Sequence, residues 1–312
     1  MGQLNTNPRI TVSLDNPDAT DQEGNGDNSS GTGHAYGALF SILDGDHLSR
    51  PLRTFIVPEI LPESFDLRTN IAVPYPKIHD QRTTSSCTAF ASVAALECTS
   101  RRQKCFPIWN LSPSYLYYML IANPASGAGQ SAVPGTLDAS VVDGGASLAS
   151  AMDMLERGVA PLSSWPISKP WNMTPDVKAQ DLARLYQATK NQCVRLEQSL
   201  DQFRTVLAAG FSILCSIVVT DNGDEWMHSS SRQHESNFLY PTAWGQQDLP
   251  KVKYAHSVLI VGYNGLARHF IIRNSWGARW GIDGHFYVAY GAVTEKFWCR
   301  DFYAVLQVNE NY

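Results

Sequence analysis

Apolar residues recur at helical spacing through the first half of the chain. From Cys87 to Glu97 they follow a period of 3.6 residues, with several alanines and no Gly or Pro to interrupt them. This pattern predicts a buried helix with Cys87 in its first turn. Further helices are predicted over four segments: 112–120, 147–157, 174–189 and 199–209.

The second half of the chain has the patterns of β-strands. Residues 211–219 form a β-rich run, and two more apolar runs, 257–263 and 269–273, flank the dipeptide Asn264-Gly265. An Asn-Gly pair between two apolar runs is a strong signal for a hairpin. The sequence therefore predicts two antiparallel strands joined at this turn.

The predicted hairpin places two polar residues near each other. His256 and Asn274 lie nine residues either side of Gly265. In a regular antiparallel hairpin, residues equally distant from the turn meet at the same end. We therefore expect His256 and Asn274 to be neighbours.

The N-terminal part of the chain has neither the helical nor the strand pattern of apolar residues. Residues 1–35 are rich in Asn, Asp, Gly, Ser and Thr, a composition that cannot bury much apolar surface. A short apolar segment, 36–43, and a proline-marked stretch follow before Leu61. We therefore divide the chain into a polar extension, 1–60, and a compact domain, 61–312.

Composition and charge exclude several classes of protein. The chain has 312 residues, 44% of them hydrophobic, and a net charge of −5, so it has no basic stripe for nucleic acid. No apolar run is long enough to span a membrane, and the first 16 residues lack the features of a secretory signal. We expect a monomer that is cytoplasmic, or exported by a route without a recognisable signal peptide.

The six cysteines are spread over the whole chain, which favours mostly free thiols over a disulfide framework. Their spacing, and that of the histidines, does not match a metal site. The sequence predicts no metal and no other cofactor.

One cysteine has the setting of a nucleophile. At the start of a helix, Cys87 meets free backbone N–H groups and partial positive charge, which are expected to lower the pKa of its thiol. An imidazole such as that of His256 can hold the thiolate and later protonate a leaving amine, and the Asn274 amide can orient the imidazole. The Gln81 side chain and the Cys87 backbone N–H can stabilise an oxyanion.

These residues lie in segments that resemble a known family, the papain-like cysteine peptidases. The resemblance covers residues 61–312 and rests on these segments: Leu61-Pro62-Glu63-Ser64-Phe65-Asp66-Leu67-Arg68, Asp80-Gln81, Ser85-Ser86-Cys87-Thr88-Ala89-Phe90, Ala255-His256-Ser257-Val258, Arg273-Asn274-Ser275-Trp276-Gly277 and Trp280-Gly281. It implies an α+β, two-lobed fold, with a helical lobe at about 75–190, a β-barrel lobe at about 191–312 and the active site in the cleft between them.

The resemblance also implies roles for single residues. Cys87 would be the nucleophile, His256 the base and acid, Asn274 the orienting residue and Gln81 the oxyanion donor of a cysteine endopeptidase acting on proteins or peptides. Trp276 would shield the hydrogen bond between Asn274 and His256 from water. The residues implied to bind substrate are Gly144, Gly145, Ala146, Ser147, Ser257, Ser85, Ser86 and Trp276.

The sequence departs from the family pattern beside the nucleophile. Thr84 stands where secreted members have a disulfide-bonded cysteine, Ser85 where they have glycine, and Thr88 where an aromatic residue is usual. These changes put the specificity of the site in question. With them, the chain most resembles a bacterial, xylellain-like branch of the family. A long polar insertion, 221–253, precedes His256, and we interpret it as a lid or a partner surface.

Other interpretations remain open at this point. The chain could be a catalytically silent papain-like binding protein, or an acyl-transfer enzyme that is not a peptidase. The extension, 1–60, either crosses the cleft as a built-in inhibitor, which would make the protein a zymogen, or is a disordered tail or targeting arm.

Overall fold

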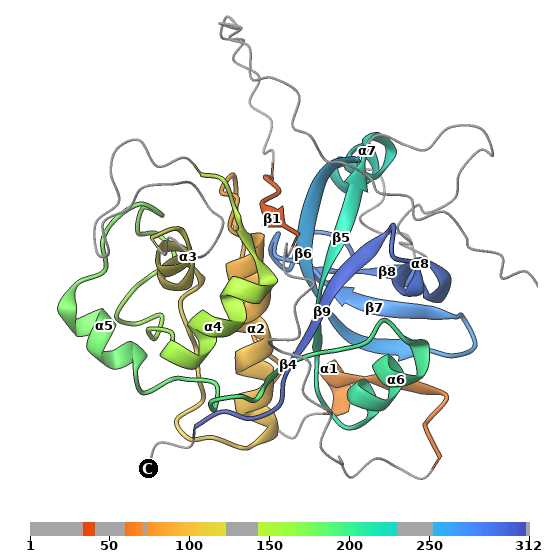
Figure 1. The fold of residues 1–312 in the computed structure, drawn as a ribbon, viewed down its shortest axis with the longest axis horizontal. Coiled ribbons are helices and arrows are strands. Elements are labelled where there is room, and N and C mark those ends of the chain that lie inside the picture. The colour runs from red at the N-terminus through yellow and green to blue at the C-terminus, as the bar shows by residue number, and fades with distance from the viewer. Residues whose placement is uncertain (1–33, 41–59, 71–73, 123–142, 230–251, 310–312) are drawn as a thin grey trace, which may run out of the picture. The chain divides into compact units, whose positions relative to one another are not determined.

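The computed structural model describes residues 34–40, 60–70, 74–122, 143–229 and 252–309 (Figure 1). Residues Thr32–Tyr312 form one compact unit. Within it, helices gather on one side and strands on the other (Figure 1). The helices of the first side are α2 (Cys87–Arg102), α3 (Pro113–Ile121), α4 (Leu148–Arg157) and α5 (Val177–Ala183).

The other side is an antiparallel sheet of seven strands, in the order β4-β9-β5-β6-β7-β8, with β2 also paired to β6. Its strands are β2 (Ser64–Asp66), β4 (Cys193–Arg195), β5 (Ile213–Thr220), β6 (Val252–Asn264), β7 (His269–Arg273), β8 (His285–Ala289) and β9 (Cys299–Val305). Four short helices accompany it: α1 (Leu67–Asn70), α6 (Leu200–Ala208), α7 (Asp221–His228) and α8 (Tyr290–Thr294). The α+β class expected from the sequence is confirmed.

A separate pair of parallel strands joins the N-terminal segment to the helical side. It consists of β1 (Ala38–Leu39) and β3 (Ala146–Ser147), with Ala38 opposite Ala146. In Figure 1, β1 lies between the helical side and the sheet. We call residues 34–40, which contain β1, the strap.

Side-chain caps explain where most predicted helices begin. The hydroxyls of Ser112, Ser147 and Ser199 accept hydrogen bonds from backbone N–H groups in the first turns of α3, α4 and α6. The predicted helix over 174–189 was wrong in length, because α5 ends at Ala183. Beyond it, the Tyr186 carbonyl accepts from the Val159 N–H just after α4, and the Ala188 N–H donates to the Leu155 carbonyl in α4, so tertiary hydrogen bonds replace helical ones.

The predicted hairpin is present, but its register differs from the expected one. The turn occupies residues 265–268, and Arg273 lies opposite Leu259, with a bulge between Ile260 and Gly262. The centre of the hairpin is therefore displaced from Gly265, and His256 and Asn274 do not form a cross-strand pair.

The insertion before His256 contains a helix that the sequence pattern did not predict. Its residues 221–228 form α7, whereas residues 230–251 lie outside the described part of the chain. The proposed lid or partner surface therefore stays a prediction. All six cysteines are described, and none forms a disulfide.

Neither a membrane span nor a metal site is found among the described residues. None of their helices is long and apolar enough to cross a bilayer. No group of three or more His, Cys, Asp or Glu side chains in these segments is arranged to hold a metal ion.

Candidate active site

Cys87 is the first residue of α2, as predicted, and it is buried. Its Sγ accepts a hydrogen bond from the Ser257 N–H at 3.4 Å, so the helix start contacts β6 directly. Burial raises the pKa of the thiol, while backbone hydrogen bonds from Ser257 and Gly37 act in the opposite direction. The expected lowering of the pKa by the helix start is therefore wrong for this structure, because burial outweighs it.

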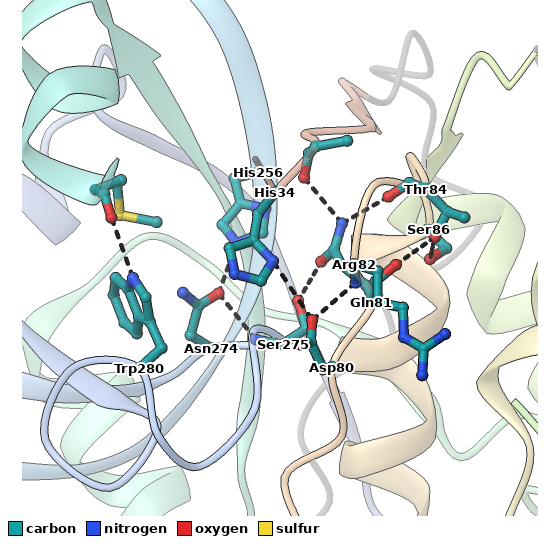
Figure 2. A network of polar contacts seen from close by, with 12 residues as sticks. His34, Asp80, Gln81, Arg82, Thr84, Ser86, His256, Asn274, Ser275 and Trp280 are labelled. Carbon is teal, nitrogen blue, oxygen red and sulfur yellow. Dashed lines mark hydrogen bonds and ion pairs between the residues drawn. The ribbon is translucent and has the colours of Figure 1, made fainter. Parts of the chain in front are cut away.

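His256 and Asn274 are hydrogen-bonded although they are not a cross-strand pair. The His256 Nε2 and the Asn274 Oδ1 are 2.7 Å apart, and the same Oδ1 accepts from the Ser275 N–H at 2.8 Å (Figure 2). The backbone N–H can only donate, so the atom facing it is the amide oxygen. That oxygen can only accept, so His256 carries its proton on Nε2.

This tautomer leaves the Nδ1 of neutral His256 with a lone pair. Among the described residues, Nδ1 has no hydrogen-bond partner although it is buried. Burial lowers the pKa of His256 to about 4, against the hydrogen bond to Asn274, and the nearby His34 and His228 lower it further. In this structure the imidazole is held neutral.

Gln81 links the start of α2 to the Asn274 segment. Its backbone N–H donates to the Ser275 carbonyl at 2.8 Å, and its Oε1 accepts from the Ser275 hydroxyl (Figure 2). Its Nε2 donates to the carbonyl oxygens of Thr84 and Ala35, at 2.8 and 2.9 Å. Both amide protons are therefore in use, one of them on the strap.

Trp276 lies at the centre of an aromatic cluster over these residues. His34 and His228 stack on its ring, with centroids 4.6 and 5.2 Å away, and His256 lies 5.4 Å away at a tilt. Trp276 is 2% exposed. Its ring lies beside His256, and the strap adds His34 and Tyr36 to the cluster. The shielding role implied for Trp276 stays a prediction.

The strap contacts both Cys87 and the segment Gly144–Ala146. Ala38 packs against Cys87 and Ala255, and the Ala146 N–H donates to the Gly37 carbonyl at 2.9 Å. The approach is so close that a Cβ on Gly37 would overlap the Ser85 carbonyl oxygen. A cavity beside Asn274 and Ser257 has a volume of only about 10 Å³.

A larger pocket lies away from these residues. Its volume is about 370 Å³, and it is formed by β2, α1 and the strands β6 to β8. Phe65, Tyr263 and Tyr287 are part of its lining, and none of the predicted site residues is.

Comparisons with known proteins agree with this arrangement. The model of the papain family cysteine proteases matches residues 227–299. An uncharacterized peptidase C1-like protein of Acanthamoeba polyphaga mimivirus is 23% identical over 266 residues, 82% of this chain and 78% of the relative. A cathepsin B-like protein of Giardia intestinalis is 26% identical over 264 residues, 79% of this chain and 75% of the relative.

The fold is also that of a solved structure. The crystal structure of xylellain, a cysteine protease from Xylella fastidiosa, superposes with a TM-score of 0.69 at 24% identity, covering 88% of this chain and 96% of xylellain. The chain is similar to the papain family of cysteine peptidases in sequence over residues 227–299 and in fold over most of its length. These similarities support a hydrolase, and the expected papain-like fold is confirmed.

Five of the residues predicted to bind substrate fall into two groups in this structure. Gly145 and Ala146 face the strap, and Gly144 is exposed next to them. Ser147 and Ser257 use their hydroxyls inside the protein, Ser147 as the cap of α4 and Ser257 in contacts with other hydroxyls. Their assignment to a pocket stays a prediction.

The residues just before Cys87 are held in place by hydrogen bonds. The Ser85 N–H donates to both oxygens of Asp143 at 3.0 Å, and the Ser86 hydroxyl is 2.6 Å from that of Thr84. Tyr117 also donates to Asp143 and accepts from the Gly145 N–H. This network ties the loop before Cys87 to the segment that contains Gly144 and Gly145.

Several of these residues could not be identified from the sequence. Asp143 and Tyr117 are far apart in the chain, and an acidic residue before Gly144-Gly145 was the only available signal. His34 and Tyr36 lie inside the extension, 1–60, at the start of the short apolar segment, and the idea that this extension crosses the cleft named no single residue. Thr88 was visible only as a departure from the family pattern.

Proposed function

We propose that the peptidase cleaves peptide bonds through Cys87, His256 and Asn274, by way of a thioester acyl-enzyme. The observation that carries this proposal is the hydrogen bond from His256 Nε2 to Asn274 Oδ1, because it leaves Nδ1 as the proton acceptor. The contact of Cys87 Sγ with the residue after His256 supports the same pairing.

In the proposed reaction, His256 Nδ1 takes the proton of the Cys87 thiol. The thiolate attacks the substrate carbonyl carbon, and the resulting oxyanion accepts hydrogen bonds from the Cys87 N–H and the Gln81 Nε2. The imidazolium then gives its proton to the leaving amine as the peptide bond breaks. A water molecule, deprotonated by the imidazole, hydrolyses the thioester and restores the thiol.

Substrate backbone would pair with the segment that contains β3. Gly144 and Gly145 carry no side chain there, so an extended chain can approach closely. The strap uses this surface in the structure, since the Ala146 N–H binds the Gly37 carbonyl. Such main-chain pairing selects extended peptides and leaves specificity to nearby side chains.

We further infer that the strap inhibits the enzyme by occupying the substrate site. It uses the Gln81 amide through Ala35, pairs with β3 and covers Cys87. In a bound substrate, the carbonyl of the scissile bond would accept a hydrogen bond from Gln81, and the residues N-terminal to that carbonyl would run along β3. In the strap, the Ala35 carbonyl accepts from Gln81, and the residues C-terminal to it, 37–39, run along β3. The strap therefore runs opposite to a substrate, which protects its own peptide bonds.

The docked strap would also suppress the chemistry of the site. Burial raises the pKa of Cys87 and lowers that of His256, so both shifts favour the neutral thiol and imidazole over their ion pair. Leaving of the strap exposes both groups to water and removes this penalty. Blocking and electrostatic suppression thus have one cause.

An epoxide inhibitor directed at thiols tests the proposed nucleophile. After residues 1–60 are trimmed, we expect mass spectrometry to find one modification, at Cys87, and five unmodified cysteines. The untrimmed chain should react much more slowly. A folded, trimmed protein that stays unlabelled at Cys87 would contradict the proposal.

Acidification is expected to open the strap through His34. Burial lowers the pKa of this imidazole in the docked strap and His228 lowers it further, whereas Asp80 and a hydrogen bond with the Arg82 backbone oppose the shift. The open state therefore binds the proton more tightly. The closed state is stable above the ordinary pKa of about 6.5 and loses stability as the pH falls below it.

The rate of Cys87 alkylation in wild type, divided by the rate in a His34→Gln variant, isolates this effect. Titration of the thiol is common to both proteins and cancels. We expect the ratio to rise severalfold between about pH 7.5 and about pH 5.5. A ratio that is independent of pH would show that His34 does not control opening.

A further inference from the structure

Thr88, the residue after Cys87, has a fully buried hydroxyl with two partners on different parts of the fold. It donates to the Ala146 carbonyl at 2.8 Å and lies 2.9 Å from the Ser257 hydroxyl. The Ser257 hydroxyl in turn lies 3.4 Å from that of Ser216. We call Ser216, Ser257 and Thr88 the hydroxyl chain.

The protons of the hydroxyl chain have a single consistent order. A carbonyl oxygen only accepts, so the one proton of Thr88 points to Ala146. Ser257 must then donate to Thr88. Because its own proton is used, Ser257 accepts from Ser216. The chain therefore runs from β5 through β6 and α2 to β3.

This chain fixes the two reacting groups relative to each other. Thr88 and Ser257 directly follow Cys87 and His256 in the sequence, and the Ser257 N–H also donates to the Cys87 Sγ at 3.4 Å. One contact between neighbouring side chains thus sets the distance between the start of α2 and the histidine of β6. The Thr88 hydroxyl also holds β3 through the Ala146 carbonyl, and β3 is where the backbone of a substrate would pair.

We propose that Thr88 is a positioning residue of the peptidase, whose hydroxyl aligns Cys87 with His256 and anchors β3. The inference rests on the proposed function of Cys87 and His256. An aromatic residue, usual at this position in the family, has no aliphatic hydroxyl to make these two bonds. When Cys87 ionises, the Thr88 hydroxyl can turn its proton from Ala146 to the thiolate, which lowers the pKa of the thiol, so loss of the hydroxyl is felt at the nucleophile itself.

Substitution of Thr88 by valine, which keeps the shape and removes the hydroxyl, tests the proposal. The background is the full chain carrying Gly37→Ala, which displaces the strap because its Cβ would overlap the Ser85 carbonyl oxygen. We expect kcat on a fluorogenic peptide to fall about 10- to 100-fold, as small misplacements of reacting groups do. The midpoint pH of Cys87 alkylation by iodoacetamide should rise. Thr88→Ser should restore both.

Ser92→Ala is the matched control. Ser92 is also buried in α2, and no described residue is a hydrogen-bond partner of its hydroxyl. This variant should keep the kcat and alkylation profile of the background. Thr88→Val with the same kcat and alkylation profile would overturn the positioning role. Absence of Cys87-dependent turnover in the background itself would overturn the proposed function and this inference with it.

Ser257→Ala gives a second measurement if Thr88→Val does not fold. It removes the donor to Thr88 but leaves the backbone bond to Cys87 and the bond from Thr88 to Ala146. We expect kcat to fall about threefold to tenfold, a smaller effect because one link of the chain is lost. An unchanged kcat in Ser257→Ala would contradict the alignment role.

Discussion

Replacing Gly37 by alanine is expected to raise the rate of peptide hydrolysis by about 10- to 100-fold. A Cβ at this position would overlap the Ser85 carbonyl oxygen, which belongs to the backbone and cannot rotate away. Overpacking of this kind costs about 1–3 kcal/mol, and each 1.4 kcal/mol changes an equilibrium about tenfold. The closed state loses this stability, whereas the open state is unaffected.

The measurement is the initial rate on a fluorogenic peptide, with the full chain and no trimming. Gly291→Ala is the control, since a Cβ there meets no atom within 4 Å. It makes the same chemical change and should leave the rate unaltered. Deletion of residues 1–60 should reach at least the rate of Gly37→Ala. If deletion leaves the rate unchanged, the strap does not inhibit the enzyme.

Replacing Cys87 by alanine is expected to abolish turnover, with a loss of about 10⁴- to 10⁶-fold in the Gly37→Ala background. Removal of a nucleophile leaves only binding and oxyanion stabilisation, which account for the residual rate in comparable enzymes. The change is small and conserves the helix, because alanine is a strong helix former.

Cys98→Ala is the matched control for this loss. Cys98 is buried in the same helix, and burial raises the pKa of its thiol to about 11, so it is not reactive near neutral pH. This variant should keep most of the activity. Thermal unfolding of both variants checks that they fold. A Cys87→Ala protein with more than about 1% of the background rate would exclude the thioester mechanism.

The elements that carry the site were predictable because their signals are local. The alanine-rich period beginning at Cys87 predicted α2, and Ser147 with Gly158 marked the limits of α4. The Asn264-Gly265 pair predicted the hairpin. Its register was not predictable from the turn alone, because a bulge shifts it at Gly262, where β2, a segment far away in the chain, also packs closely.

The residues of the candidate site could be named from the sequence, but the protonation state of its cysteine could not be predicted. Cys87, His256, Asn274 and Gln81 were named from the sequence, and the structure places them in adjoining segments, while their catalytic roles stay a prediction. The direction of the pKa shift of Cys87 was not predictable, because a helix start favours the thiolate while burial under the strap favours the thiol. Burial includes the packing of Ala38 against Cys87, a contact with a residue about 50 positions earlier in the chain.

By itself, the sequence determined the helix and hairpin that carry Cys87, His256 and Asn274, since period, caps and turn residues act over short distances. Only the tertiary structure decided the closed strap, the lowered pKa of His256 and the order of the hydroxyl chain. Each depends on groups far apart in the chain being brought into contact and removed from water. Burial and long-range hydrogen bonding are properties of the packed molecule, so no local pattern encodes them.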